Sequence, residues 1–211
     1  PSIPAEKKDY TTGDHYSYVG YGQSYWATQT FTPLETYTTD KLVAYWSRAE
    51  PPGTITVALR LTDGAGKPTG GDLATGQTDG NTLPQMQTFD WRAVSIEPYE
   101  LQQGVMYAYL ARAPGAANIG SFYWRTTESQ SAYPRGRSWI STNSGGSWGE
   151  NWRDNNFEVW SAAKPGLSFK AGILHVRHPA LLTVVHKRGE LIVSGYDTLS
   201  SLDEECLTGQ V

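Results

Sequence analysis

The most visible catalytic pattern lies in residues 137–160, a stretch that holds four of the eight tryptophans. Residues 145–149 match the G-x-S-x-G motif that presents a nucleophilic serine, here Ser147, and Asp154 and three histidines follow in the order of a catalytic triad. That motif needs a strand before the serine and a helix after it. The residues after Ser147 have poor helix propensity and lead into a strand, so we interpret Ser147 as a turn residue.

Acidic residues in the same stretch offer a second chemistry. Glu150, Asp154 and Glu158 could supply the carboxylate pair that glycoside cleavage uses, provided that two of them face one cleft about 5–10 Å apart. Acidic residues that flank strands are usually solvated, and nothing in their spacing indicates a cleft. We therefore expect no enzyme activity and no catalytic residue.

The histidines and the cysteine bear on metal binding. His175 and His178 have a spacing that places two ligands together on a helix, but they lie in apparently extended chain, and no third ligand is indicated. Cys206 is the only cysteine, which excludes an intrachain disulfide and a zinc site built on thiolates. We expect no metal and no cofactor.

The centre of the aromatic stretch is typical of a hairpin turn. Residues 141–148 combine small polar side chains, which bond their own backbone, with glycines that permit positive φ. Strand patterns flank this turn, around Trp139 and around Phe157. Residues 141–148 also resemble the Asp-box hairpin of sialidase-type propellers, with Asn143 in place of the aspartate. The box occurs once, so the repeats of a propeller are missing.

Tryptophans beside polar side chains also indicate a sugar-binding surface, because sugars pack flat C–H faces on aromatic rings and bond polar groups through hydroxyls. The alternative is that these rings fill the core, as most large aromatic side chains do. The candidate glycan contacts are Trp139, Trp148, Trp152, Asn151, Arg153 and Asp154, with Tyr133 beside them.

Composition restricts the class of protein. A chain of 211 residues can bury one substantial core and a small appendage. Abundant Gly, Thr, Ser, Tyr and Trp favour β structure with many turns. The chain has a net charge of −4 and no visible basic patch that would neutralise the phosphates of a nucleic acid, which argues against such a partner. No apolar run approaches the roughly 20 residues of a membrane span, and no signal peptide is indicated.

Alternating apolar residues predict about eight strands between residues 24 and 163, spaced as in an antiparallel β-sandwich. Residues 54–61 are the clearest strand, residues 63–80 are interpreted as a surface loop, and a bulge is expected near Ala93. The residues expected to face the core are Ile55, Val57, Leu59, Leu61, Phe89, Trp91, Tyr107 and Phe157.

Two terminal segments have a different character. Residues 1–23 are rich in Tyr and Gly and are interpreted as an extended N-terminal arm. Residues 164–211 lack Trp, and residues 181–186 and 190–194 predict a short β-hairpin. So short a segment cannot easily shield its own apolar residues, so we expect it to be an assembly element covered by another chain. The assembly contacts would be Leu181, Leu182, Val184, Val185, Leu191, Ile192 and Val193, together with Ile173 and Leu174.

Several fragments resemble a jelly-roll domain found in phage virion proteins and bacterial surface-anchored proteins. The matching fragments are residues 28–33 (TQTFTP), 63–70 (DGAGKPTG), 73–76 (LATG), Leu101 with Gly104 and Tyr107, 145–148 (GGSW) and 154–157 (DNNF). The resemblance covers about residues 25–160 and implies a jelly-roll-like sandwich that serves attachment, display or sugar binding. Its motifs are structural, so they indicate fold more than activity.

Two functions follow as expectations. The first is a non-enzymatic virion or cell-surface protein (a decoration, spike or tail component) that assembles with itself or with a larger particle. The second is a carbohydrate-binding module that recognises glycans through surface aromatics. The expected location is the virion surface, with an extracellular or cell-surface location as the alternative.

Overall fold

A computed structural model describes residues 5–11, 18–118, 120–127, 133–163, 183–187 and 190–194. Two compact units divide the chain, one of residues 4–163 and one that includes residues 164–211. The described residues are nearly all β, with one 3-10 turn at Gly80–Thr82 and no α-helix. The predicted all-β fold, an antiparallel sandwich, is confirmed. No helix among these residues is long and apolar enough to cross a membrane.

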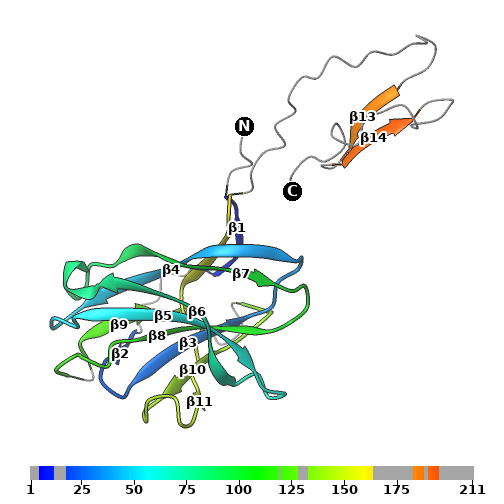
Figure 1. Ribbon diagram of the computed structural model, residues 1–211. Coiled ribbons are helices and arrows are strands. Elements are labelled where there is room, and N and C mark those ends of the chain that lie inside the picture. The colour runs from blue at the N-terminus through cyan, green and yellow to red at the C-terminus, as the bar shows by residue number, and fades with distance from the viewer. Residues whose placement is uncertain are drawn as a thin grey trace. The chain divides into compact units, whose positions relative to one another are not determined.

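Two antiparallel sheets form the larger unit (Figure 1). The first contains, in order, β1 (Lys7–Thr11), β12 (Phe157–Ser161), β4 (Tyr37–Arg48), β9 (Phe122–Arg125) and β2 (Tyr18–Tyr21), and β7 (Asp90–Leu101) pairs with the other edge of β4. The second contains, in order, β11 (Gly149–Glu150), β10 (Ser138–Ser141), β3 (Trp26–Phe31), β8 (Tyr107–Arg112), β5 (Thr54–Thr62) and β6 (Pro68–Asp79). This order is compatible with a jelly-roll-like sandwich.

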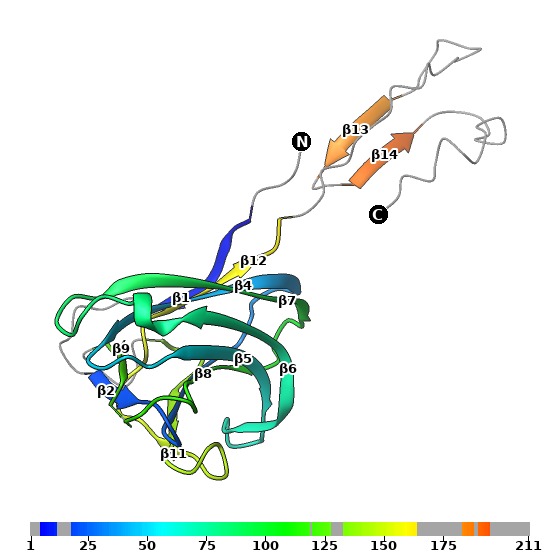
Figure 2. The same ribbon diagram turned by 60° about the vertical axis from the view of Figure 1, so that its left-hand side comes forward.

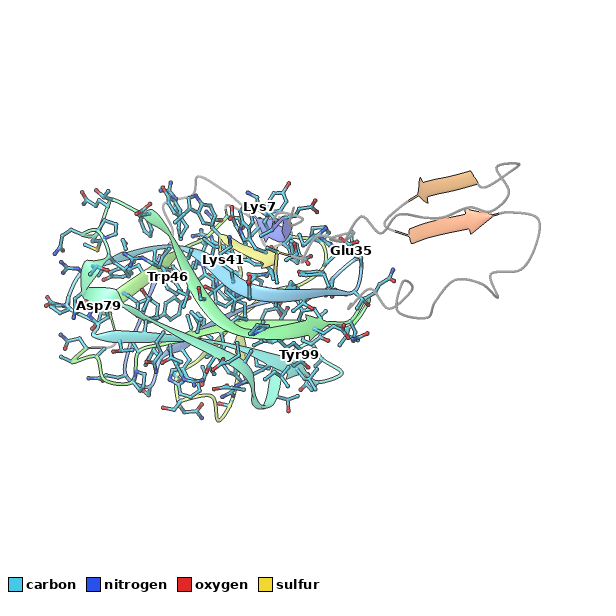
Figure 3. All side chains as sticks on the ribbon, turned by 45° about the horizontal axis from the view of Figure 1, so that its top comes forward. Lys7, Glu35, Lys41, Trp46, Asp79 and Tyr99 are labelled. Carbon is cyan, nitrogen blue, oxygen red and sulfur yellow. The ribbon has the colours of Figure 1, made fainter. Side chains whose placement is uncertain are left out.

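The core lies between the two sheets, where side chains of alternate strand positions meet. Trp46 and Trp124 are fully buried and pack edge to face with ring centroids 5.7 Å apart. Figure 3 labels Trp46 among the side chains of the sandwich. Five of the eight residues predicted to face inward are buried there: Ile55, Val57, Leu59, Tyr107 and Phe157.

The other three predicted core residues are not buried. Phe89 and Trp91 are half-buried on the outer face of the first sheet, because Val94 and Ile96 are the residues of β7 that face the core. Trp91 stacks on Tyr45 there, with ring centroids 4.9 Å apart. This segment alternates as predicted, but the face that packs on the core is the one with Val94 and Ile96.

The expected bulge near Ala93 is also absent from β7. The register between β4 and β7 is continuous from Lys41 opposite Ser95 to Trp46 opposite Asp90. The shift lies further along, where Thr39 pairs with Tyr99. Leu61, the third misassigned residue, is 43% exposed and lies next to the last residue of β5.

Two segments predicted to be irregular contain strands. Residues 68–79 lie in the expected loop but form β6, which pairs with β5 along the edge of the second sheet, so only the turn at Asp63–Lys67 is a loop. Residues 7–11 and 18–21 lie in the expected N-terminal arm, and they form β1 and β2 of the first sheet. The sandwich therefore includes strands that precede residue 24.

The predicted hairpin is present but shorter than expected. Its partner strands are β10 and β11, with Trp139 opposite Glu150. Phe157–Ser161 does not pair with β10, because β12 lies in the first sheet between β1 and β4. The chain therefore crosses from one sheet to the other between Glu150 and Phe157.

The smaller unit contains the predicted C-terminal hairpin. β13 (Thr183–Lys187) and β14 (Glu190–Ser194) are antiparallel, with Val184 opposite Val193 and Val185 opposite Ile192. Leu191 pairs with His186. Leu181, Leu182, Ile173 and Leu174 lie outside the described residues, as do His175 and His178.

Candidate functional site

The outer face of the second sheet is the candidate site. The register places Trp139 beside Thr28, Thr28 beside Leu110, and Leu110 beside Ala58. Their chain neighbours Ala27, Ala111 and Val57 belong to the core, so this row faces away from the first sheet. Leu110 and Ala58 are nonetheless fully buried. The outer face is therefore covered by other parts of the chain.

The β10–β11 hairpin turn supplies one part of this cover. Asn143 organises the turn: its Oδ1 accepts 2.8 Å and 2.9 Å hydrogen bonds from the Ser147 amide and the Ser141 hydroxyl, and its Nδ2 donates to the Ser147 hydroxyl. Gly145 has φ +83°, and a Cβ there would lie 2.8 Å from the Trp26 ring. Only glycine fits both this backbone conformation and this close approach to β3.

The turn between β5 and β6 supplies the second part. Asp63 closes it, because its carboxylate accepts 2.9 Å hydrogen bonds from the amides of Ala65 and Lys67. The Lys67 ammonium lies 5.7 Å from the centroid of the Trp139 ring, a cation–π contact. Each turn thus covers a tryptophan of the sheet beneath it, Trp26 under the hairpin turn and Trp139 under Lys67.

Two open hollows border these turns. The first hollow, about 570 Å³, is lined by Trp139, Thr30, residues 64–66 and residues 134–137. The second hollow, about 380 Å³, is lined by Trp148, Arg60, Lys67 and residues 145–147. The Asp63–Lys67 turn contributes residues to both hollows. Aromatic rings, hydroxyls and bare glycine backbone thus occur together on this face.

Most of the cations on this face are already paired with carboxylates. Asp72 accepts 2.6 Å bonds from both Arg60 and Arg112, whose guanidinium groups lie 5.7 Å and 5.0 Å from the Trp26 ring centroid. Partial burial alone would raise the pKa of Asp72, but the hydrogen bonds from Arg112 and Arg60 outweigh it and hold that pKa below its ordinary value.

The two arginines of the first hollow are paired as well. Arg137 lies 2.7 Å from Glu150 across the hairpin, and Arg135 lies 3.0 Å from the buried Asp9. Lys67 differs, because it forms no ion pair within the part of the chain that the structure describes. Among the described residues that line these hollows, Lys67 therefore holds the cationic group that has no carboxylate partner.

Three buried polar atoms on this face have no hydrogen-bond partner among the described residues. They are Nε1 of Trp139, Oγ1 of Thr28 and Nε1 of Trp26. Trp139 and Thr28 are directly opposite each other in the β10–β3 register. Buried polar groups in native proteins are nearly always bonded to protein, water or ligand. Other unpartnered polar atoms lie in the core and in the first sheet, so these three by themselves do not single out this face.

The structure separates the residues that the sequence predicted as glycan contacts. Trp139 and Trp148 line the two hollows. Trp152 is 76% exposed, and Asn151 and Arg153 are half-buried, with their backbones bonded to Ser138. None of these three residues lines either hollow.

Asp154 and Tyr133 point into the protein. The Asp154 carboxylate accepts hydrogen bonds of 3.0 Å from the Gln29 side chain and 2.9 Å from the Tyr133 amide, and both acceptor oxygens are buried. The Tyr133 ring packs edge to face on Phe157. These two residues hold the crossing segment against β3, which is a structural role.

Sequence reasoning missed Lys67, Arg60, Asp72 and Trp26. Their positions are far apart in the sequence, and only the strand register brings them to one face. The local signal at residues 63–67 was a turn pattern, which gave no indication of what the turn covers.

Ser147 lies in the hairpin turn, with β11 after it and no helix among the residues that follow in the described sandwich. Its hydroxyl accepts a 3.0 Å hydrogen bond from Asn143. Among the described residues, no three His, Cys, Asp or Glu side chains gather as a metal site would require.

Comparison of the sequence with protein-family models finds no matching family, and comparison with curated proteins finds no significant match. The function is therefore argued from the fold and from this face of the sheet.

Proposed function

We propose that this chain is a non-enzymatic attachment or display protein of a virion surface or cell surface, which assembles with copies of itself or with a larger particle. The sandwich is the displayed module, and residues 164–211 are the assembly element. The resemblance to jelly-roll domains of virion and surface proteins supports the same class.

The observation that carries this proposal is the pairing of the first and last strands of the sandwich. The Ser161 amide donates a 2.7 Å hydrogen bond to the Glu6 carbonyl, and the Glu6 amide donates to the Ser161 hydroxyl. The chain therefore enters and leaves the sandwich side by side. Figures 1 and 2 show β1 and β12 on one side of the sandwich and the β10–β11 hairpin on the other. Attachment through two adjacent ends would present the sandwich as one module.

The β13–β14 hairpin supports the assembly role through its sequence. Five of its ten strand residues are apolar: Val184, Val185, Leu191, Ile192 and Val193. A segment of about fifty residues buries too small a fraction of its surface to cover these apolar side chains by itself. A second chain, or the particle that carries the protein, would supply the missing cover.

A second candidate is a free carbohydrate-binding module, and a specific observation favours it. Trp139 and Trp148 line separate hollows on one face, beside hydroxyl and backbone groups. Ring and polar group together are what a shallow sugar site needs. In this case the chain binds glycans as a single molecule and needs no assembly.

The molar mass of the full chain in solution separates the two candidates. An attachment or display protein is expected at a multiple of the 23.2 kDa chain mass, and a free binding module at the chain mass itself. Multi-angle light scattering behind size exclusion measures this directly. A monomer at every concentration would contradict self-assembly and favour the binding module.

The proposed absence of catalysis has its own test. Because Ser147 bonds Asn143 within a turn, a serine-directed phosphonate should not label it. Stoichiometric labelling of Ser147 would show that the residue is a nucleophile and would overturn the non-enzymatic assignment.

A further inference from the structure

From the outer face of the second sheet we infer a binding site for an acidic saccharide, in which Lys67 recognises the carboxylate of the sugar. The site comprises the two hollows, with Trp139 in the first, Trp148 in the second and the Asp63–Lys67 turn contributing to both. The inference rests on the proposed attachment function and specifies the class of partner that the sandwich would attach to.

The first step is the chemistry of the lining. Trp139 and Trp148 provide aromatic surface in two places on one face. Thr30 and Ser147 provide hydroxyls, and Gly66 and Gly146 leave the backbone bare. Sugars pack C–H faces on rings and exchange hydrogen bonds through hydroxyls, so this combination fits a saccharide better than an apolar ligand.

The second step is the unpartnered polar atoms. Trp139 Nε1 is a donor without an acceptor, and Thr28 Oγ1, directly opposite in the register, also has no partner among the described residues. Both atoms are buried and Thr28 lines neither hollow, so a sugar hydroxyl would reach them through a bound water rather than directly. An aliphatic ligand would leave both atoms unbonded.

The third step is charge. Arg60 and Arg112 are neutralised in part by Asp72, and Arg135 and Arg137 are paired with Asp9 and Glu150. A strongly anionic ligand such as a nucleic acid would need several unpaired cations. Among the described residues that line the hollows, Lys67 is the cation without a carboxylate partner, and the two arginines that share Asp72 leave one further net positive charge. So few positive charges suit the single carboxylate of an acidic sugar residue.

The position of Lys67 is the fourth step. Its ammonium lies over Trp139, which lines the first hollow, and Lys67 itself lines the second. A saccharide chain that occupied both hollows would cross the turn beside Lys67. Because a lysine ammonium sits on a flexible four-carbon stem, it can leave the ring for a carboxylate without any movement of the backbone.

The opposite sheet offers a matched control. The Lys41 ammonium lies 4.0 Å from the centroid of the Trp160 ring, which is the same kind of contact as that of Lys67 with Trp139. Lys41 belongs to β4 of the first sheet, and Figure 3 labels it beside Lys7 of β1. It lies outside both hollows, so its removal changes the net charge equally without touching the proposed site.

The test is isothermal titration of the full chain with short oligogalacturonates, oligoglucuronates and sialosides, each beside its neutral methyl ester. At least one acid should bind about tenfold or more tightly than its ester, and added salt should weaken that binding. Lys67→Ala should abolish the preference for the acid, Lys67→Arg should retain most of it, and Lys41→Ala should leave it unchanged. Circular dichroism of each variant checks that the fold is intact.

Three results would overturn the inference. They are equal binding of acid and ester, an acid preference that survives Lys67→Ala, and no binding of any acid by the full chain. None of these depends on the molar mass of the protein. If the chain assembles but does not bind acidic saccharides, the proposed site is wrong and the attachment proposal is unaffected.

Discussion

The hydroxyl of Tyr133 donates a 2.9 Å hydrogen bond to the carboxylate of Asp9, which is 124 positions earlier in the chain. Both residues are buried. The Tyr37 hydroxyl donates a second bond of 2.8 Å to the same carboxylate, and Arg135 lies 3.0 Å away. Asp9 therefore links β1 to β4 and to the segment before β10. The strand that begins the sandwich is fixed by a charge as well as by its pairing with β12.

Removal of this charge should weaken the fold strongly. Asp9→Ala leaves two buried hydroxyls and one guanidinium without their acceptor, and breaking a buried pair typically costs about 3–5 kcal/mol. Urea unfolding of Asp9→Ala should show a loss of this size. Glu35→Ala is the control, because Glu35 is 59% exposed and pairs with Lys8 at the surface. A loss as small as that of Glu35→Ala would show that Asp9 does not fix β1.

The same tyrosines predict how stability changes with pH. Burial, followed by the nearby charge of Asp9, raises the pKa of Tyr37 and of Tyr133 far above the ordinary value. In the unfolded chain these phenols ionise near pH 10, whereas the folded protein keeps them protonated. The unfolded state therefore releases protons first as pH rises. The two protonated tyrosines therefore contribute fully to the free energy of unfolding below about pH 10, and this contribution is lost as the pH rises above it.

Absorbance of tyrosinate measures this directly. Some of the 13 tyrosines should ionise only when the far-UV circular dichroism signal is lost, in one cooperative step above about pH 10. Smooth ionisation of all tyrosines in a protein that stays folded would contradict the burial of Tyr37 and Tyr133.

Two leucines of β5 test which residues face the core. Leu59 is fully buried and Leu61 is 43% exposed. Leu59→Ala should destabilise the protein by about 2–5 kcal/mol, because it leaves a cavity in the core. Leu61→Ala removes the same atoms from a surface position, so it should change stability by about 0.5 kcal/mol or less. An equal loss of stability in the two variants would indicate that Leu61 is buried in the core.

The hairpin turn depends on one side chain. Asn143→Ala removes the acceptor of the Ser147 amide and of the Ser141 hydroxyl, and each such bond contributes about 0.5–1.5 kcal/mol. Asn143→Asp keeps that acceptor and serves as the control. Differential scanning calorimetry should show a lower Tm for the alanine variant alone. A similar Tm for both would mean that the glycines, rather than Asn143, set the turn.

Much of the fold could be predicted from strand patterns. The alternation of Ile55, Val57 and Leu59 identified β5, and the apolar run at Tyr107–Ala111 is typical of a central strand. β8 does lie between β3 and β5. What alternation cannot supply is the choice of face, as Phe89 and Trp91 show: they alternate as a core strand does, but pack outside on Tyr45.

The candidate site was less predictable, since it depends on register and on turns. Trp139 and Trp148 were identified because aromatic residues were dense around the hairpin. Lys67 could not be identified in this way. It is 72 positions from Trp139 in the sequence, and its own segment has the pattern of an ordinary surface loop. β6 was missed for a related reason: its glycines and threonines predict turns locally, and only pairing with β5 makes the segment a strand.

The central claim is that residues 164–211 assemble the chain while the sandwich stands alone. It is tested most directly by the molar mass of the full chain and of a variant that ends after Ala163, each measured by light scattering with circular dichroism as the check of fold. We predict a multiple of 23.2 kDa for the full chain and a folded monomer for the truncated one. A monomeric full chain, or a truncated chain that unfolds, would contradict the claim.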